Sequence, residues 1–193
     1  MPKLLVLYAS THGQTEKIAS RICEVLRDQG VEAVAERVEG HVTLDPSDFD
    51  AVVVGASVHA GHHQREVLDW AKAHATTLSS MPSAFFSVSL SAAEDNDESR
   101  EANRGYIDDF SDQTGWTATE TTAFAGALQY LEYDFMTKLL MRLMMKRDHR
   151  PTDTSHDYEY TDWEQVEGFA RTCAAMVGGP ARTVGAVNNP WGE

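Results

Sequence analysis

The stretch KLLVLYASTHGQT, residues 3–15, decides the fold class of this chain. Its first seven residues are almost all apolar, which is typical of a strand that is buried on both faces. A polar turn follows, and apolar residues then recur at the spacing of one helix face, at Ile18, Ile22, Val25 and Leu26. Gly30 stands where a glycine commonly ends a helix. The stretch and its surroundings therefore predict a buried strand, a loop and a helix.

The rest of the chain repeats this alternation of strands and helices. Further strands are predicted at residues 31–38, 51–57, 84–90 and 121–128. Apolar stripes predict helices between them, one through Val67, Ala71, His74 and Leu78 and another through Tyr106, Ile107 and Phe110. Thr161 and Glu164 form a capping box for a last helix, which a Gly-Gly-Pro sequence at 178–180 should end.

This order of elements predicts one α/β domain. Strands separated by helices imply right-handed βαβ units and a parallel sheet. Five such strands fit a doubly wound, flavodoxin-like sheet with the order 2-1-3-4-5. Residues 131–150 do not fit this count and are predicted as an extra helix inserted after strand five. The domain is expected to span residues 1–178, with a loose tail at 179–193.

Composition and charge exclude several classes of protein. The chain has 193 residues, of which 42% are hydrophobic and 24% charged, so wholesale disorder is not expected. It contains no stretch of about 20 apolar residues and no signal-peptide pattern. Cys23 and Cys173 are too few for a disulfide framework and lie on helix stripes, so we expect buried, reduced thiols in a cytosolic protein. The net charge of −14 argues against a nucleic-acid partner, and it fits either a high-salt cytoplasm or a merely acidic mesophile.

The first loop has the composition of a phosphate cradle. It lies between the first strand and the first helix, where a helix N-terminus offers unpaired N–H groups to an anion. Glycine permits close approach and hydroxyl residues add donors; the residues are Ser10, Thr11, His12, Gly13, Gln14 and Thr15. No lysine follows the glycine and neither common nucleotide-binding fingerprint is present, so a monophosphate ester is favoured over a nucleoside triphosphate. The alternative is an ordinary turn with a helix cap.

This hexapeptide resembles the FMN-phosphate loop of the flavodoxin family, although His12 replaces a hydroxyl residue. The resemblance implies FMN as the cofactor and assigns the flavin ring to the loops after the third and fourth strands. The implied ring-binding residues are Ser57, Val58, His59, Ala60, Gly61, Ser89, Leu90, Ser91 and Ala92. These loops offer imidazoles but no other aromatic group, so one face of the ring is expected to be open to a large planar substrate.

The histidines of the second loop allow several interpretations. His59, His62 and His63 have no acidic or thiol residue at ligand spacing, so a metal site is not expected. We expect them in a solvated loop or at the flavin edge. The chemistry would be centred on the flavin, with no single catalytic side chain and with His59 as a candidate proton partner.

The inserted segment LEYDFMTKLLMRLMMKRDHR, residues 131–150, is amphipathic and basic. Residues 136–150 carry five basic residues against one acid. The apolar face comprises Met136, Leu139, Leu140, Leu143 and Met144, and the basic face Lys138, Arg142 and Lys146. This pattern is typical of an interfacial membrane helix or a greasy binding surface, with a core-packing helix as the alternative.

Longer stretches point to one subfamily. GASVHAGHH (55–63), HATTLSSMPSAFFSVSLSA (74–92), AGALQY (125–130), KLLMRLMMK (138–146) and YTDWEQVEGFAR (160–171) resemble the flavodoxin-type, quinone-dependent protoporphyrinogen IX oxidases. The resemblance implies an enzyme of haem biosynthesis that oxidises protoporphyrinogen IX to protoporphyrin IX, uses FMN and passes electrons to a membrane quinone. It also implies a cytoplasmic protein associated peripherally with the anionic inner face of the cell membrane. The alternative is an electron-carrier flavodoxin that docks to redox partners without a substrate of its own.

Overall fold

A parallel sheet forms the centre of the computed structural model, which describes residues 1–40, 42–128 and 158–178. Its strands are β1 (Lys3–Ala9), β2 (Glu32–Arg37), β3 (Ala51–His59), β5 (Ser83–Ser89) and β6 (Glu120–Ala125). They are all parallel and lie in the order β2-β1-β3-β5-β6. The doubly wound order 2-1-3-4-5 is therefore confirmed, since β5 and β6 are the fourth and fifth parallel strands of the chain.

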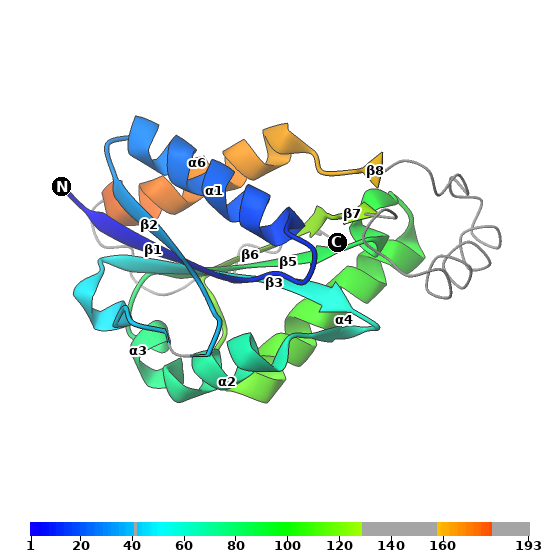
Figure 1. Cartoon of the computed structure of the whole chain (residues 1–193), viewed down its shortest axis with the longest axis horizontal. Coiled ribbons are helices and arrows are strands. Elements are labelled where there is room, and N and C mark those ends of the chain that lie inside the picture. The colour runs from blue at the N-terminus through cyan, green and yellow to red at the C-terminus, as the bar shows by residue number, and fades with distance from the viewer. Residues whose placement is uncertain (41, 129–157, 179–193) are drawn as a thin grey trace.

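Helices cover both faces of this sheet (Figure 1). The helices are α1 (Gln14–Asp28), α2 (Arg65–Ala73), α3 (Ala75–Ser79), α4 (Asp97–Thr114) and α6 (Trp163–Gly178), and Pro46–Asp48 and Ser91–Ala93 form short 3-10 turns. Helices α1 and α6 lie on one face, and α2, α3 and α4 lie on the other. Alternate residues of β1 serve the two cores, because Leu4 and Val6 pack under α1 whereas Leu5 and Leu7 pack under α2 and α4.

Gly55 of β3 lies directly against the ring of Phe86 on the neighbouring strand. A Cβ at this position would lie 2.0 Å from Cζ of Phe86 on β5. Phe86 is fully buried and packs against Phe124 and Phe169, with ring centroids 5.6 and 6.1 Å away, so it has no room to move. Glycine at position 55 is therefore required by the packing of the neighbouring strand.

Three helix predictions need correction. The single helix predicted through residues 67–78 is two helices, because the chain breaks at His74, whose ring stacks on Trp70 at 4.4 Å. The capping box at Thr161 is wrong: a carboxylate oxygen of Asp162 accepts hydrogen bonds from the N–H groups of Glu164 and Gln165. The helix predicted through Tyr106, Ile107 and Phe110 starts earlier, because α4 begins at Asp97 and so includes most of the polar, acidic residues 94–104.

The ends of two strands differ from the prediction. The fifth parallel strand stops at Ala125, and Gly126 separates it from β7 (Ala127–Leu128), which pairs antiparallel with β8 (Tyr158–Glu159). Beyond residue 57, β3 continues into a hairpin with β4 (His62–His63). The predicted helix at 131–150 and the loose tail at 179–193 lie outside the described residues.

Both cysteines lie in the core of the domain. Cys23 and Cys173 are buried and unpaired with each other, and burial raises the pKa of the Cys23 thiol to about 11. The expectation of buried thiols on the inner stripes is confirmed. In the described ranges, no helix combines the length and the apolarity needed to cross a membrane.

Candidate functional site

The three loops singled out in the sequence meet at one edge of the sheet. β1, β3 and β5 are parallel neighbours, so the segments that follow them lie side by side at the carboxyl edge. The rings of His12 and His59, from the first and second loops, lie 6.0 Å apart in an edge-to-face arrangement. The amide of Gln64 also joins these loops by donating to Thr11 and Ser57.

The first loop presents the N-terminus of α1. Gly13 is the N-cap residue with φ +82°, and no side chain of the described residues caps the helix. A Cβ at Gly13 would meet no protein atom, so the left-handed backbone, and not packing, calls for glycine here. The Ser10 hydroxyl accepts a hydrogen bond from the Gly13 N–H at 2.9 Å, which holds the turn. The N–H groups of the first turn of α1 are left for a ligand.

Buried polar atoms without partners gather at the same loop. Thr15 is fully buried, and its hydroxyl has no hydrogen-bond partner among the described residues. The same holds for the amide oxygens of Gln14 and Gln64. A buried polar group left unpaired costs about 1–3 kcal/mol, so this concentration indicates a place for a polar ligand. The hydroxyl of Thr15 and the N–H groups beside it are donors, which suits the oxygens of a phosphate.

A cationic side chain of the edge strand β2 contacts the backbone of the first loop, and the sequence analysis did not single out this residue. Arg37 of β2 donates to the backbone carbonyl of Ser10 at 2.9 Å. Its guanidinium also pairs with Glu39 at 2.8 Å and with Glu16 at 4.0 Å. Because its charge is shared with two carboxylates, Arg37 acts mainly by holding the loop backbone.

The second loop is an exposed hairpin with a buried anchor. Ala60 at its tip has φ +50°, a left-handed conformation that is uncommon for residues other than glycine. His63 is only 8% exposed; its Nε2 lies 3.0 Å from the Ser87 hydroxyl and its ring packs on Phe110 at 5.3 Å. Burial lowers the pKa of His63 to about 4, so the ring is neutral near pH 7.

The expectation that His63 lies in a solvated loop or at a flavin edge is wrong. His59 and His62 are exposed, whereas His63 points into the core between β5 and α4. Across the three described ranges, no group of three His, Cys, Asp or Glu side chains could hold a metal ion.

The third loop is fastened to α4 by Asn103. The amide oxygen of this residue, 3% exposed, accepts hydrogen bonds from the hydroxyls of Ser89 at 2.7 Å and Ser91 at 2.9 Å. The Ser89 hydroxyl in turn accepts from the N–H of Ala92 at 3.2 Å. The two serine hydroxyls therefore fix the loop, and Leu90, Ser91 and Ala92 stay half-buried at the sheet edge. Sequence reasoning missed Asn103 because it lies in an acidic segment that carried no motif.

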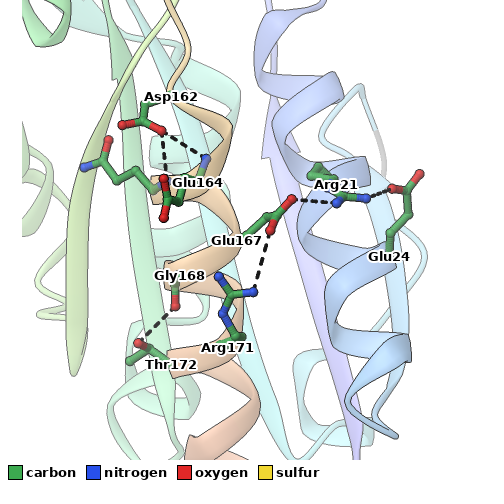
Figure 2. A network of polar contacts seen from close by, with 9 residues as sticks. Arg21, Glu24, Asp162, Glu164, Glu167, Gly168, Arg171 and Thr172 are labelled. Atoms are coloured by element: carbon green, nitrogen blue, oxygen red, sulfur yellow. Dashed lines mark hydrogen bonds and ion pairs between the residues drawn. The ribbon is translucent and has the colours of Figure 1, made fainter.

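The first loop is also tied to the last helix. The amide of Gln14 donates to the Thr161 hydroxyl at 2.8 Å, and that hydroxyl donates to the carbonyl of Ala125 at 2.7 Å. Further along, Figure 2 shows Arg21 of α1 between Glu24 and Glu167, at 2.7 and 2.6 Å. These bonds fix α1 against α6, and with it the position of the loop that begins α1.

Comparison with known proteins identifies the family. The model of the flavodoxin domain matches residues 5–155, most of the chain. The chain belongs to the flavodoxin domain family. Two curated relatives are named protoporphyrinogen IX dehydrogenase [quinone]. That of Escherichia coli K12 is 36% identical over 178 residues, covering 92% of this chain and 98% of the relative. That of Leishmania major is 35% identical over 176 residues, covering 91% and 76%.

Solved flavodoxins share the fold of this flavodoxin domain. A short-chain flavodoxin associated with a bacterial microcompartment superposes with a TM-score of 0.56 at 18% identity, over 92% of this chain and 99% of that one. Oxidised flavodoxin 1 of Bacillus cereus gives 0.54 at 16% identity, over 89% and 96%. A flavodoxin domain implies a flavin cofactor, and the uncapped helix and the unpaired Thr15 hydroxyl fit the phosphate of such a group.

The structure thus brings together the predicted residues of all three loops and adds four that the sequence did not single out, Arg37, Gln64, Ser87 and Asn103. The basic, methionine-rich residues predicted at 136–146 lie outside the described part of the chain.

Proposed function

We propose that this flavodoxin-family protein is an FMN-dependent dehydrogenase of haem biosynthesis. It oxidises protoporphyrinogen IX to protoporphyrin IX and passes the electrons to a membrane quinone. The observation that carries the proposal is the 36% identity to the Escherichia coli protoporphyrinogen IX dehydrogenase [quinone], which extends over 92% of this chain and 98% of that relative. Identity over nearly the full length of both chains includes the segment after strand five, which a carrier flavodoxin does not need.

The first loop is the proposed phosphate site. Its N–H groups and the hydroxyl of Thr15 would donate to the phosphate oxygens of FMN, and the dipole of α1 favours the negative charge. Ser10 keeps the turn in shape from inside through its bond to the Gly13 N–H. Because Arg37 is paired with carboxylates, the dipole and the N–H donors supply most of the neutralisation.

The second and third loops are the proposed ring site. The hairpin of residues 57–61 and the turn of residues 89–92 would present backbone N–H and C=O groups to the polar edge of the flavin. When bound, FMN accepts hydrogen from the substrate and delivers electrons to the quinone. The protein contributes rigid placement, through His63 under the hairpin and Asn103 under the turn. His59, exposed on the hairpin, is the proposed proton partner.

The proposed place of action is the cytoplasmic, anionic face of the cell membrane, where quinone is available. The support is the sequence of residues 136–150, with five basic residues against one acid in a chain of net charge −14. Burial of Met136, Leu139, Leu140, Leu143 and Met144 would add to the attraction of Lys138, Arg142 and Lys146 for acidic lipids. The acidic remainder of the protein would face away from the bilayer.

Anaerobic mixing of the FMN-loaded protein with protoporphyrinogen IX tests the proposal. We expect bleaching of the flavin absorbance together with the appearance of porphyrin fluorescence, followed by recovery of the flavin colour when quinone is added. A carrier flavodoxin would keep its colour in the first step, because it has no site for the porphyrinogen. Retention of the flavin colour with no porphyrin fluorescence would reject the dehydrogenase and favour the carrier.

A further inference from the structure

Gln64 links two of the loops that form the candidate site. Its amide nitrogen donates to the Thr11 hydroxyl of the first loop at 3.0 Å and to the Ser57 hydroxyl of the second loop. Thr11 and Ser57 are 46 positions apart in the sequence and have no direct bond to each other among the described contacts. The amide therefore sets the spacing between these loops.

The side chain of Gln64 is directed to the loops and away from its own helix. Gln64 is the N-cap residue of α2, with extended φ and ψ of −63° and 139°, yet its side chain makes no capping bond. Its carbonyl oxygen accepts from the Leu68 N–H at 3.3 Å, so the helix begins normally without help from the amide. The side chain of Gln64 therefore does not stabilise α2. Its amide instead binds residues at the carboxyl edge of the sheet.

The remaining atom of this amide needs a donor. The Oε1 of Gln64 is buried and has no hydrogen-bond partner in the described part of the chain. It lies on a bridge between the loop that suits a phosphate and the loop proposed for the flavin ring. A ligand that spans both loops has to cross this bridge, and in FMN the connecting part is the ribityl chain, which carries hydroxyl donors.

We propose that Gln64 is a ribityl-binding residue, whose amide oxygen accepts a hydrogen bond from a hydroxyl of the flavin side chain while its nitrogen holds Thr11 and Ser57 in place. This inference rests on the flavin cofactor of the proposed function and is independent of the identity of the reduced substrate. The amide acts between phosphate and ring, so it contributes to the binding of any flavin with a ribityl chain, phosphorylated or not.

The test measures the affinity of the flavin-free, full-length protein for three flavins by fluorescence quenching. FMN has a ribityl chain and a phosphate, riboflavin has the ribityl chain only, and lumiflavin has neither. The substitution Gln64→Leu should weaken FMN and riboflavin about tenfold more than it weakens lumiflavin. The loss of the bonds to Thr11 and Ser57 acts on all three flavins, whereas the loss of the acceptor oxygen acts only on the two with a ribityl chain. The matched control is Gln113→Leu, at an exposed glutamine of α4, which should change none of the three.

A second variant separates binding from folding. Gln64→Glu keeps an acceptor oxygen at the same reach, so riboflavin should bind within about threefold of the wild-type affinity. The added negative charge should weaken FMN more than riboflavin, because only FMN carries a phosphate nearby. A merely structural role would lower all three affinities in parallel in Gln64→Leu.

Several results would overturn the inference. Equal weakening of lumiflavin, loss confined to FMN, or unchanged affinity for all three in Gln64→Leu would each do so while the proposed function stands. A wild-type protein that binds flavin yet leaves protoporphyrinogen IX unoxidised would remove the proposed function and leave the Gln64 result valid. A wild-type protein that binds no flavin would reject both.

Discussion

Acidification should destabilise this protein in a window set by His63. The unfolded chain binds a proton on this imidazole near its ordinary pKa of 6.5, whereas the folded protein does so only near a pKa of about 4. Burial among Phe85, Phe110 and Ser87 is the main cause; of the charged neighbours, Asp109 of α4 raises this pKa and His62 of the hairpin lowers it. Between these two pH values the unfolded state binds more protons, so stability falls as the pH falls.

The magnitude follows from the width of the window. Each pH unit within it removes up to about 1.4 kcal/mol, and the full interval from 6.5 to 4 removes about 3 kcal/mol. From pH 7 to pH 4.5 the loss attributable to His63 is about 2 kcal/mol. The stabilisation is complete from about one pH unit above 6.5, where the ring is neutral in both states.

A double variant isolates this contribution from that of the many carboxylates. The substitution His63→Phe combined with Ser87→Ala keeps the aromatic packing and avoids leaving the buried Ser87 hydroxyl unpaired. Urea unfolding of wild type and variant, followed by tryptophan fluorescence at pH 7 and at pH 4.5, gives the difference in free energy of unfolding at each pH. We expect the difference to shift by about 2 kcal/mol in favour of the variant at the lower pH. A difference that stays constant within about 0.5 kcal/mol would refute the buried neutral histidine.

Three further sets of substitutions test the packing of the sheet, the binding of the FMN phosphate and the binding to anionic membranes. Gly55→Ala should lower the free energy of unfolding by about 2 kcal/mol, because its Cβ meets the immobile ring of Phe86, whereas Gly168→Ala in an open helix position should raise it by about 0.5–1 kcal/mol in the same urea titration. Thr15→Val should have effects of opposite sign: the flavin-free protein gains stability because an unpaired buried hydroxyl is removed, and FMN affinity falls by about 2 kcal/mol; equal affinity in both proteins would move the phosphate elsewhere. A charge-reversal variant should sediment less with anionic liposomes than wild type, and wild-type binding should weaken with salt without vanishing; equal sedimentation would indicate a core-packing helix. Its three changes to Glu are at Lys138, Arg142 and Lys146.

Local patterns predicted most of the sheet and the first loop. The apolar run at residues 3–9 forms the central strand β1. A strand that is buried on both faces is apolar along its whole length, and the local sequence alone shows this. His63 shows what local sequence patterns do not predict. Its neighbours in the sequence, His62 and Gln64, are polar, and only the pairing of β4 with β3 turns the ring toward Ser87 and Phe110. Asn103 and Gln64 were missed for the same reason, since their bonds join segments that the sequence separates.

Thr161 shows a different limit. A threonine three residues before a glutamate has the spacing of a capping box, and Asp162 next to it competes for the same N–H groups. Asp162 caps the helix because the Thr161 hydroxyl is used in tertiary contacts. It donates to the carbonyl of Ala125 and accepts from the amide of Gln14. Propensity rules place the start of the helix within one or two residues, and the partner of each hydroxyl depends on strands that arrive from elsewhere.

The short pairing of β7 with β8 has a consequence for how this protein can diversify. Leu128 and Tyr158, the described residues on either side of positions 129–157, lie directly opposite each other, and the Tyr160 N–H donates to the Gly126 carbonyl at 3.1 Å. Because the pairing of β7 with β8 holds these two positions together, the number of residues between them has little effect on the sheet; doubling that number costs only about 0.6 kcal/mol of closure entropy. The sheet that carries the candidate site can therefore keep its geometry when residues are inserted or deleted between positions 128 and 158.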